Sequence, residues 1–509
     1  MKYACGITGI TKYNGLVVNE KFLPILDPNM VFIKPQYRED IQKAFDRLKK
    51  LISGEEIIAH AKEYYHYTDE VEFLPYLRKL QDPAITEISV DTETTSLSPR
   101  KGAILGFVFS TAPHEGVYVD AHIVEYYYEE FEEIFKTKKC IFHNSKFDIQ
   151  FIEYEYGFEF PDFEDTMLMH YCLDESIGTH GLKQLALKFT DLGDYERELD
   201  EYKKTWCRQH KIKLDEFNYG MLPPGILAPY GCKDGDATIQ LYRKFAPKIA
   251  NNKEFRNLYE NILKPVTKAI IHIESNGGPI SIDVLEYIIK DYQIDIEETL
   301  NEIALDPAVI RFEEEQEKKF NPNSVFHLRE VLFGILKLKP IKKTDTGAFS
   351  TDAEVLGLLK HPLTDAILDL RKKVKLSQTY LKNIKEGVDK DDRLRSSFNV
   401  TGTTSGRLSS SGVLNYQNLP RDKDAGIKKV FTAREGYSIV QADLGTAEVY
   451  IAAALSNDKF LQRAFLEKMD FHSYVAHAMF KLPCTIAEVK TLYPDERQWA
   501  KAITFGINV

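Results

Sequence analysis

Short apolar runs separated by turn residues recur between residues 85 and 142. Runs of this length that are rich in β-branched and aromatic side chains predict strands. Apolar residues at helical spacing then predict helices over Leu182–Phe189 and Asp234–Phe245. Strands followed by helices predict an α/β sheet with helices on its faces. The expected strands are Ile85–Val90, Ala103–Ser110, Gly116–Asp120 and Cys140–Phe142.

The pattern becomes largely helical from about residue 251 to residue 394. Two amphipathic segments cover Leu263–Ser275 and Ile282–Leu305, and an Asn-Gly-Gly-Pro break at 276–279 predicts a turn between them. Beyond this part the chain is rich in Thr, Ser and Gly. A strand is then predicted over Tyr437–Ala442, and helices follow from Ala447 onward. A charged stretch, Ile41–Leu51, is helical in pattern and carries no chemistry.

Composition narrows the class of protein. The chain has 509 residues, of which 43% are hydrophobic and 28% charged, so several domains are expected. No apolar run approaches the roughly 18 residues of a membrane span, and no signal peptide follows Met1. The six cysteines form no CxxC pair, which favours a reducing compartment over a zinc site or a disulfide framework. We therefore predict a cytoplasmic protein without a membrane partner.

The net charge of −11 at first disfavours a nucleic-acid partner. Net charge, however, describes solubility and non-specific binding, whereas local patches decide contact. Basic residues cluster at Lys337–Lys343 and Arg371–Lys375. Such runs on helices are usually solvated faces, so they are weak evidence by themselves.

Two carboxylates follow the first predicted strand, Asp91 and Glu93. Residues i and i+2 of a strand point to the same face. Two like charges side by side repel each other unless a cation lies between them. The pair therefore predicts one half of a divalent-metal site.

Three later segments are candidates for the other half of the site. Asn144 to Asp148 follow a predicted strand, and Asp165 and Thr166 open a helix. Tyr230 and Asp234 have the i, i+4 spacing of one helical face. Clustered carboxylates of this kind suit two-metal hydrolysis of a phosphodiester, and a tyrosine hydroxyl can orient the attacking water. Each segment alone is weak evidence, because a solvated loop or an ordinary helix cap has the same residues.

In this order, on an α/β pattern, the segments are jointly specific, and they resemble the three motifs of DEDD-type 3′–5′ exonucleases of the tyrosine subtype. The resemblance implies two Mg²⁺ or Mn²⁺ ions per active site, and a ribonuclease H-like α/β fold. It implies terminal-nucleotide contacts by Leu97 and Asn144. It also implies catalytic and metal-binding roles for Asp91, Glu93, Asp148 and Asp234, with Tyr230 as the catalytic tyrosine.

A second group of candidates lies in the C-terminal part. Arg407, Gln417 and Asn418, in the Ser/Gly-rich stretch 401–420, suit contacts with a nucleic-acid backbone and minor groove, although a flexible loop has the same composition. The strand predicted over Tyr437–Ala442 leads to Asp443. The Asp443 carboxylate and the Leu444 carbonyl are candidate metal ligands, although an aspartate before a helix is commonly an N-cap.

A four-residue spacing places Arg497, Lys501 and Phe505 along one helical face. Two cations below an aromatic ring suit a triphosphate with a stacked base. A solvated basic face with Phe505 in the core is the alternative explanation.

Together these segments resemble family A DNA polymerases of the bacterial DNA polymerase I type. Asp443 to Glu448 resemble motif A, with Glu448 excluding a ribose 2′-OH. Residues 470–473 resemble the segment in which a histidine, here His472, contacts the triphosphate. Residues 497–506 resemble the first part of motif B, with nucleotide contacts by Arg497, Lys501 and Phe505.

The resemblance spans about residues 85–509 and implies a multidomain α/β and α protein. The expected parts are an N-terminal extension of unknown function (1–83), the 3′–5′ exonuclease (84–250), a helical thumb with its connecting region (251–397), a partial palm (398–460) and the start of the fingers (461–509).

Three departures from the family pattern are visible. Ser405 intervenes before Gly406, motif A has Gly445 and Thr446 where the family has Ser and Gln, and Val509 stands at the motif B tyrosine. Motif C, which carries the second metal-binding aspartate, is not among the 509 residues. Because two-metal phosphoryl transfer needs both aspartates, we expect no primer extension by this chain alone.

The leading hypothesis is the N-terminal portion of a split or interrupted, phage-like DNA polymerase with proofreading. Its partners would be primer-template DNA, single-stranded 3′ ends, dNTP and a C-terminal polymerase fragment. The alternatives are a stand-alone 3′–5′ exonuclease that grips DNA with a polymerase remnant, and a non-catalytic primer-template binding protein.

Overall fold

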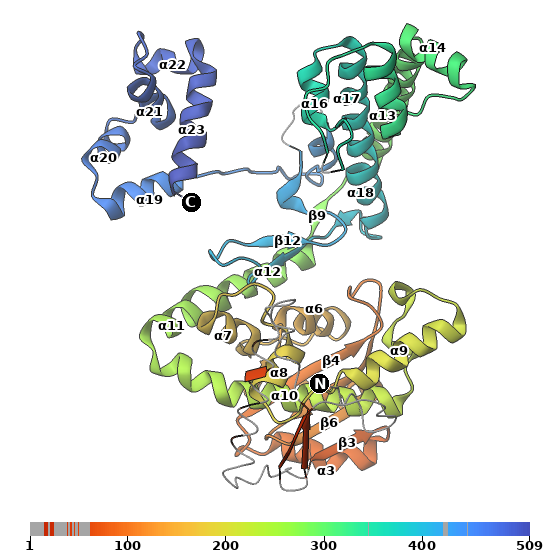
Figure 1. Cartoon of the computed structure of the whole chain (residues 1–509). Helices are drawn as coiled ribbons and strands as arrows, with labels where there is room; N and C mark the ends of the chain where they lie inside the picture. Colours follow the sequence, from red (N-terminus) through yellow and green to blue (C-terminus); the bar gives the residue numbers. More distant parts are fainter. Residues whose placement is uncertain are drawn as a thin grey trace. The chain divides into compact units, whose positions relative to one another are not determined.

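The structure is a computed structural model that describes residues 62–508 except 345, 421–425 and 445. It also describes 15–18, 21–24 and the single positions 38, 41, 42, 45 and 49. Two compact units cover Met1–Phe431 and Thr432–Val509 (Figure 1). Strands β1 (Gly15–Val18) and β2 (Lys21–Pro24) pair as a hairpin. The predicted helix Ile41–Leu51 lies mostly outside the described residues.

A six-stranded sheet forms the centre of the first unit, in the order β3-β6-β5-β4-β7-β8. Strand β5 is antiparallel to both of its neighbours, and the other pairs are parallel. This confirms the predicted ribonuclease H-like α/β fold. The strands are β3 (Glu63–Tyr67), β4 (Glu87–Thr94), β5 (Ile104–Ser110), β6 (Glu115–Asp120), β7 (Lys139–Phe142) and β8 (Phe163–Asp165).

The sheet begins earlier in the chain than predicted. Strand β3 and helix α3 (Glu70–Gln81) come from residues that were assigned to the N-terminal extension. β3 pairs with β6, and the buried Phe73, Leu77 and Leu80 of α3 join the main core. The predicted boundary at residue 84 therefore falls inside this unit. The sequence of β3, with three tyrosines among five residues, has no apolar–polar alternation by which to recognise it.

Helices cover both faces of the sheet (Figure 1). Phe107 and Phe109 of β5 point to one face and pack there with Phe131 and Phe135. Val108, between them, points to the opposite face, which helix α10 covers. This is the two-residue period of a strand with both faces buried. The helices on the first face are α4 (Ala121–Tyr126), α5 (Tyr128–Thr137) and α6 (Ser145–Glu155), together with α3.

Helix α10 (Pro224–Asn251) lies unusually close to the sheet. It includes the predicted helix Asp234–Phe245 and begins ten residues earlier. A side chain at Gly116 of β6 would place its Cβ 2.3 Å from the carbonyl oxygen of Cys232. Val108 would be as close as 2.9 Å to a Cβ at Gly231. Glycine at these positions therefore sets the distance between α10 and the strands. The neighbouring helices are α7 (Thr166–Leu173), α8 (Leu182–Phe189), α9 (Arg197–His210) and α11 (Lys253–Leu258).

The remainder of the first unit is mainly helical, as predicted. The turn at 276–279 is confirmed, because Gly277 has φ +60° and strand β9 (Gly278–Pro279) pairs with β10 (Arg393–Leu394). A second short pair joins β11 (Ser397–Asn399) to β12 (Ser409–Ser411). The helices are α12 (Lys264–Asn276), α13 (Ile282–Ala304), α14 (Pro307–Gln316), α15 (Val325–Arg329), α16 (Ala353–Leu359), α17 (Pro362–Lys375) and α18 (Lys382–Gly387).

The second unit contains five helices among its described residues. The prediction of helices from Ala447 onward is confirmed, but the strand predicted over Tyr437–Ala442 is wrong. A strand needs a neighbour for its backbone hydrogen bonds, and no described strand pairs with this segment. The helices are α19 (Ala447–Ser456), α20 (Lys459–Leu466), α21 (Phe471–Phe480), α22 (Ile486–Leu492) and α23 (Pro494–Asn508).

None of the described helices combines the length and the apolar character that crossing a membrane requires.

Candidate nuclease site

Strand β4 places Asp91 and Glu93 on the face of the sheet that α10 covers. The sequence predicts that both carboxylates follow the end of the strand. The strand continues to Thr94, however, so both lie within it. The hydroxyl of Ser89, on the same face, donates to the carbonyl oxygen of Gly235 in α10 (2.9 Å). One potential ligand atom from each of Asp91, Glu93 and Asp234 lies within 4.8 Å of the others. We call these three residues the acidic cluster.

The electrostatics of the acidic cluster are unfavourable without a cation. Glu93 is 4% exposed, and its Oε1 atom is buried without a hydrogen-bond partner in the described part of the chain. Burial and then the Asp234 charge raise the pKa of Glu93 well above its usual range. Desolvation, followed by the charges of Asp148 and Asp234, raises the pKa of Asp91 well above its usual range. Buried like charges with an unsatisfied oxygen are the expected donor set for a divalent ion.

Asp148 approaches this region from the first turn of α6. Its Oδ1 accepts hydrogen bonds from the backbone N–H (2.9 Å) and the hydroxyl (2.7 Å) of Thr92. Burial raises the pKa of Asp148 to about 7, although the Thr92 hydrogen bonds oppose the shift. Asp148 is not one of the three mutually close carboxylates of the acidic cluster. One of its oxygens is held by the strand that carries Asp91.

Tyr230 and Asp234 lie on adjacent turns of α10, as their spacing predicted. Tyr230 is 7% exposed, and burial followed by the charge of Asp234 raises its pKa, so the phenol is neutral. The hydroxyl of Tyr195 donates to Oδ1 of Asp234 (2.5 Å). The ammonium group of Lys183, on α8, forms an ion pair with the same oxygen. Sequence reasoning missed Lys183, Tyr195 and Thr92, because ordinary helix and strand residues give no signal of such long-range contacts.

A tight turn positions Asn144. Its φ of +66° is in the left-handed region, which asparagine tolerates better than most residues. The carboxylate of Asp165 fastens the turn, since it accepts from the backbone N–H groups of Asn144 (3.2 Å) and Ser145 (2.8 Å) and from the Ser145 hydroxyl (2.7 Å). Asp165 also caps α7, so the predicted helix start is confirmed. Its role in the fold is to hold α6 and α7 together.

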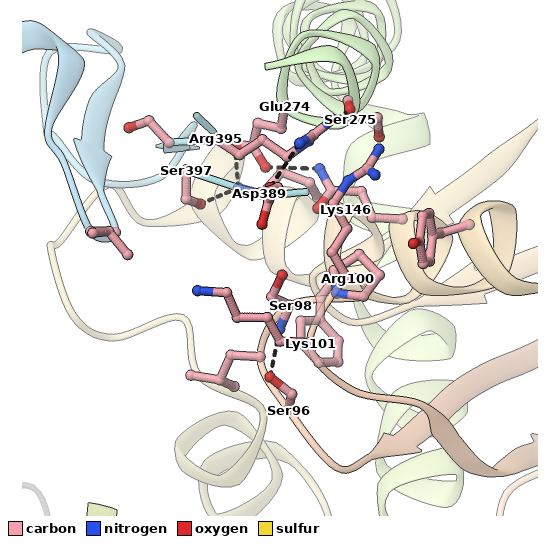
Figure 2. A pocket seen from close by; sticks show the side chains of 18 of the residues that line it. Ser96, Ser98, Arg100, Lys101, Lys146, Glu274, Ser275, Asp389, Arg395 and Ser397 are labelled. Carbon is pink, nitrogen blue, oxygen red and sulfur yellow. Dashed lines mark hydrogen bonds and ion pairs between the residues drawn. The ribbon is translucent and has the colours of Figure 1, made fainter. Parts of the chain in front are cut away.

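A cavity of about 500 Å³ includes Leu97 and Asn144 in its lining (Figure 2). Figure 2 shows Ser96, Ser98 and Lys101 of the loop after β4 opposite Arg395 and Ser397. Leu97 is 91% exposed, so its side chain is available for contact. Lys101 forms no ion pair among the described residues, whereas Arg395 is paired with Asp389 and Asp391.

The predicted polymerase residues are divided between the two units. In the first unit, Arg407 is exposed in the turn before β12. Gln417 donates from its side-chain amide to the carbonyl oxygen of Leu408 (2.9 Å), and the Asn418 carbonyl accepts from the hydroxyl of Tyr380 (3.1 Å). Both contacts hold the exposed segment after β12. The assigned DNA contacts of these residues stay predictions.

In the second unit, helices α21 and α23 pack together and bring His472, Arg497 and Lys501 into one neighbourhood. Arg497 forms a bidentate pair with Asp470, through Nε to Oδ1 (3.0 Å) and Nη2 to Oδ2 (2.8 Å). Burial and then the charge of Arg497 lower the pKa of His472, although the charge of Asp470 opposes the shift. The imidazole of His472 is therefore neutral at pH 7.

Asp443 is exposed and forms no hydrogen bond or ion pair within the described residues. Leu444 is 83% exposed, and Glu448 is exposed in the first turn of α19. The backbone of Phe505 is helical, and its side chain is outside the described part of the structure. The roles assigned to these four residues stay predictions.

Two family models match separate parts of the chain. Residues 64–250 match the 3′-5′ exonuclease family, and residues 290–508 match DNA polymerase family A. These are the two families that the motifs of the chain resemble.

The DNA polymerase of Escherichia phage T5 is 40% identical over 99% of this chain and 62% of its own length. DNA polymerase I of Borreliella burgdorferi is 28% identical over 87% of this chain and 47% of its own length. The DNA polymerase of Bacillus phage SP01 is 26% identical over 100% of this chain and 63% of its own length. The chain thus spans between about half and three fifths of these relatives.

Among solved structures, the POL domain of Pol1 from M. smegmatis, in complex with DNA primer-template and dNTP, has a TM-score of 0.66 to this chain. The two share 22% sequence identity, and the match covers 87% of this chain and 71% of that one. At this identity the match shows a common fold.

Proposed function

We propose that this chain carries the proofreading 3′–5′ exonuclease of a family A DNA polymerase, which removes nucleotides from the 3′ ends of DNA. The observation that carries the proposal is the acidic cluster of Asp91, Glu93 and Asp234, with a buried Glu93 oxygen that has no hydrogen-bond partner in the described chain. The match of residues 64–250 to the 3′-5′ exonuclease family supports it.

The donor set fits divalent cations, because it consists of closely spaced carboxylates in a desolvated place. Asp91, Glu93, Asp148 and Asp234 would hold two Mg²⁺ or Mn²⁺ ions. When bound, the ions would activate a water and stabilise the leaving oxygen.

The protein's own groups have distinct tasks in this mechanism. Tyr230 holds a neutral hydroxyl beside Asp234, where it can orient the attacking water by a hydrogen bond. Leu97 and Asn144 would contact the terminal nucleotide from the lining of the cavity. Thr92 fixes one oxygen of Asp148, so the orientation of that carboxylate is set before substrate arrives.

The purified chain should digest single-stranded DNA from its 3′ end in the presence of Mg²⁺ and should stop when EDTA is added. It should degrade a mispaired 3′ end faster than a paired one, because the site accepts a melted end. A gel assay with 5′-labelled primers measures both rates. The absence of metal-dependent digestion would contradict the exonuclease assignment, and equal rates on the two ends would contradict proofreading.

We also propose that the polymerase-like region acts in template-directed synthesis. It would contact primer-template DNA through Arg407, Gln417 and Asn418. It would contact dNTP through Glu448, His472, Arg497, Lys501 and Phe505. Asp443 and the Leu444 carbonyl would bind metal. The names of the relatives support this proposal. The second metal-binding aspartate would come from a further polymerase segment, in another polypeptide or in a further part of the same one.

Primer extension tests the need for that segment. The 509-residue chain alone should extend no primer, and addition of a fragment with motif C should start synthesis. Extension by the chain alone would contradict the requirement. A role in phage DNA replication in the cytoplasm of a bacterial host is part of the same proposal.

A further inference from the structure

A lysine occupies the acidic cluster. Lys183 lies in the first turn of α8, and its ammonium group is ion-paired with Oδ1 of Asp234. The same nitrogen lies 4.2 Å from the centre of the Tyr230 ring and 4.8 Å from that of Tyr195. The Lys183 side chain is 22% exposed, whereas that of Asp234 is 7% exposed. The ammonium group of Lys183 thus lies against the carboxylate of Asp234 and beside the rings of Tyr195 and Tyr230.

The charge of Lys183 also reaches the rest of the cluster. Asp91 and Glu93 lie close enough to Lys183 for its charge to favour their ionised forms, against the effects of burial and of the other carboxylates. An ammonium group and a divalent cation have the same electrostatic effect here, since each neutralises the charge of crowded carboxylates. The two cations compete for the Asp234 carboxylate, because a carboxylate paired with a lysine presents a repelling positive charge to an approaching metal ion.

We infer that Lys183 is an internal counter-ion of the metal-free site, and that its ammonium group must leave Asp234 when a divalent ion binds there. The hydroxyl of Tyr195 donates to the same oxygen and lies 3.5 Å from the Lys183 ammonium nitrogen, so Asp234 keeps one hydrogen-bond partner when the lysine leaves. Metal affinity is then set partly by an exchange between two cations. This inference rests on the proposed function, since it concerns the same acidic cluster.

A purely structural role for Lys183 predicts different behaviour. If the lysine only packs α8 against α10, its removal should loosen the site and weaken metal binding. If it is a competing counter-ion, its removal should strengthen metal binding while it destabilises the metal-free protein, whose carboxylates then repel each other without compensation. The two roles therefore predict changes of opposite sign.

The experiment is a Mn²⁺ titration of the full chain, followed by the electron paramagnetic resonance signal of free Mn²⁺. Lys183→Met keeps much of the side-chain volume and removes the charge, and we expect it to bind Mn²⁺ at least about tenfold more tightly than the wild type. Its melting temperature without metal should be lower, and the rise on addition of Mn²⁺ should be larger than in the wild type.

Two controls define the cause. Lys183→Arg retains the charge and should bind Mn²⁺ within a factor of about three of the wild type. Lys188→Met removes an exposed charge from the same helix and should leave the affinity unchanged. Unchanged or weaker binding by Lys183→Met, or an equal gain in Lys183→Arg, would overturn the inference.

A measurement on the unmodified protein does not depend on the folding of any variant. Acetylation of Lys183 by a soluble acylating reagent, followed by mass spectrometry, should become several times faster when Mg²⁺ is added, because the ammonium group is released from Asp234. Acetylation of Lys188 should not change. Equal acetylation of Lys183 with and without Mg²⁺ would also overturn the inference.

The two proposals fail in different ways. A wild-type chain that binds no Mn²⁺, or whose binding survives Asp91→Ala, would contradict the metal site and with it the proposed exonuclease. Mn²⁺ binding that requires Asp91 but does not respond to Lys183→Met would contradict the counter-ion role alone.

Discussion

Replacement of Asp91 by alanine is expected to lower the rate of 3′-end digestion by about 10³-fold or more, because metal-assisted stabilisation of the transition state contributes several kcal/mol and each 1.4 kcal/mol is tenfold in rate. Asp91 belongs to the acidic cluster with Glu93 and Asp234. Binding of single-stranded DNA should stay roughly intact, since the cavity next to Leu97 and Asn144 is unchanged. Single-turnover digestion and fluorescence anisotropy measure the two quantities.

Two further variants show whether the loss comes from the metal site. Asp91→Asn keeps the shape of the side chain and removes its charge, so it should lose activity almost as completely. Asp215→Ala removes an exposed carboxylate outside the cluster and should digest at the wild-type rate. Activity of Asp91→Ala near that of the wild type would refute the assignment of the cluster as the exonuclease site.

Replacement of Glu274 by alanine is expected to lower the free energy of unfolding of the first unit by about 3–5 kcal/mol, the usual cost of removing one partner of a buried ion pair. Glu274, on α12, is 7% exposed and pairs with Lys146 of α6 (2.8 Å). It also accepts from the side-chain amide of Gln150 (2.8 Å) and from the backbone N–H of Phe398 (2.5 Å). The alanine variant would leave the Gln150 amide of α6 and the Phe398 N–H of β11 without this acceptor, and it would remove the carboxylate that pairs with Lys146.

Urea denaturation followed by circular dichroism measures the change. The amide hydrogen of Phe398 should also exchange with solvent much faster in the variant, because it loses its acceptor. Glu298→Ala, an exposed position on α13, should alter the free energy of unfolding by no more than about 0.5 kcal/mol. A Glu274→Ala chain as stable as Glu298→Ala would contradict the importance of the buried pair.

Local pattern was enough to predict the elements that carry the site. The apolar run before Asp91 marked β4, and the period of two placed Asp91 and Glu93 on one face. The helix Leu182–Phe189 was predicted with its observed bounds. Tyr230 and Asp234 needed only the four-residue spacing of a helix.

Contacts between distant segments could not be predicted in this way. Lys183 and Asp234 are 51 residues apart, and their meeting depends on how α8 packs beside α10. The hydrogen bond that holds Asp148 comes from Thr92, 56 residues earlier. The strand expected over Tyr437–Ala442 failed for a related reason, since an apolar run forms a strand only where a second strand is available to pair with it.

The glycine at position 116 has a consequence for how such an enzyme diversifies. Helix α10, which carries Asp234, packs backbone against backbone on strand β6, at Cys232 and Gly116. The loop after β4, which contributes Leu97 and Lys101 to the cavity, takes no part in this contact between Gly116 and Cys232. Selection, or a protein engineer, can therefore vary the lining of the cavity at this loop and leave the packing of α10 on the sheet as it is. The same argument makes position 116 a poor place to introduce variation and the loop a good one.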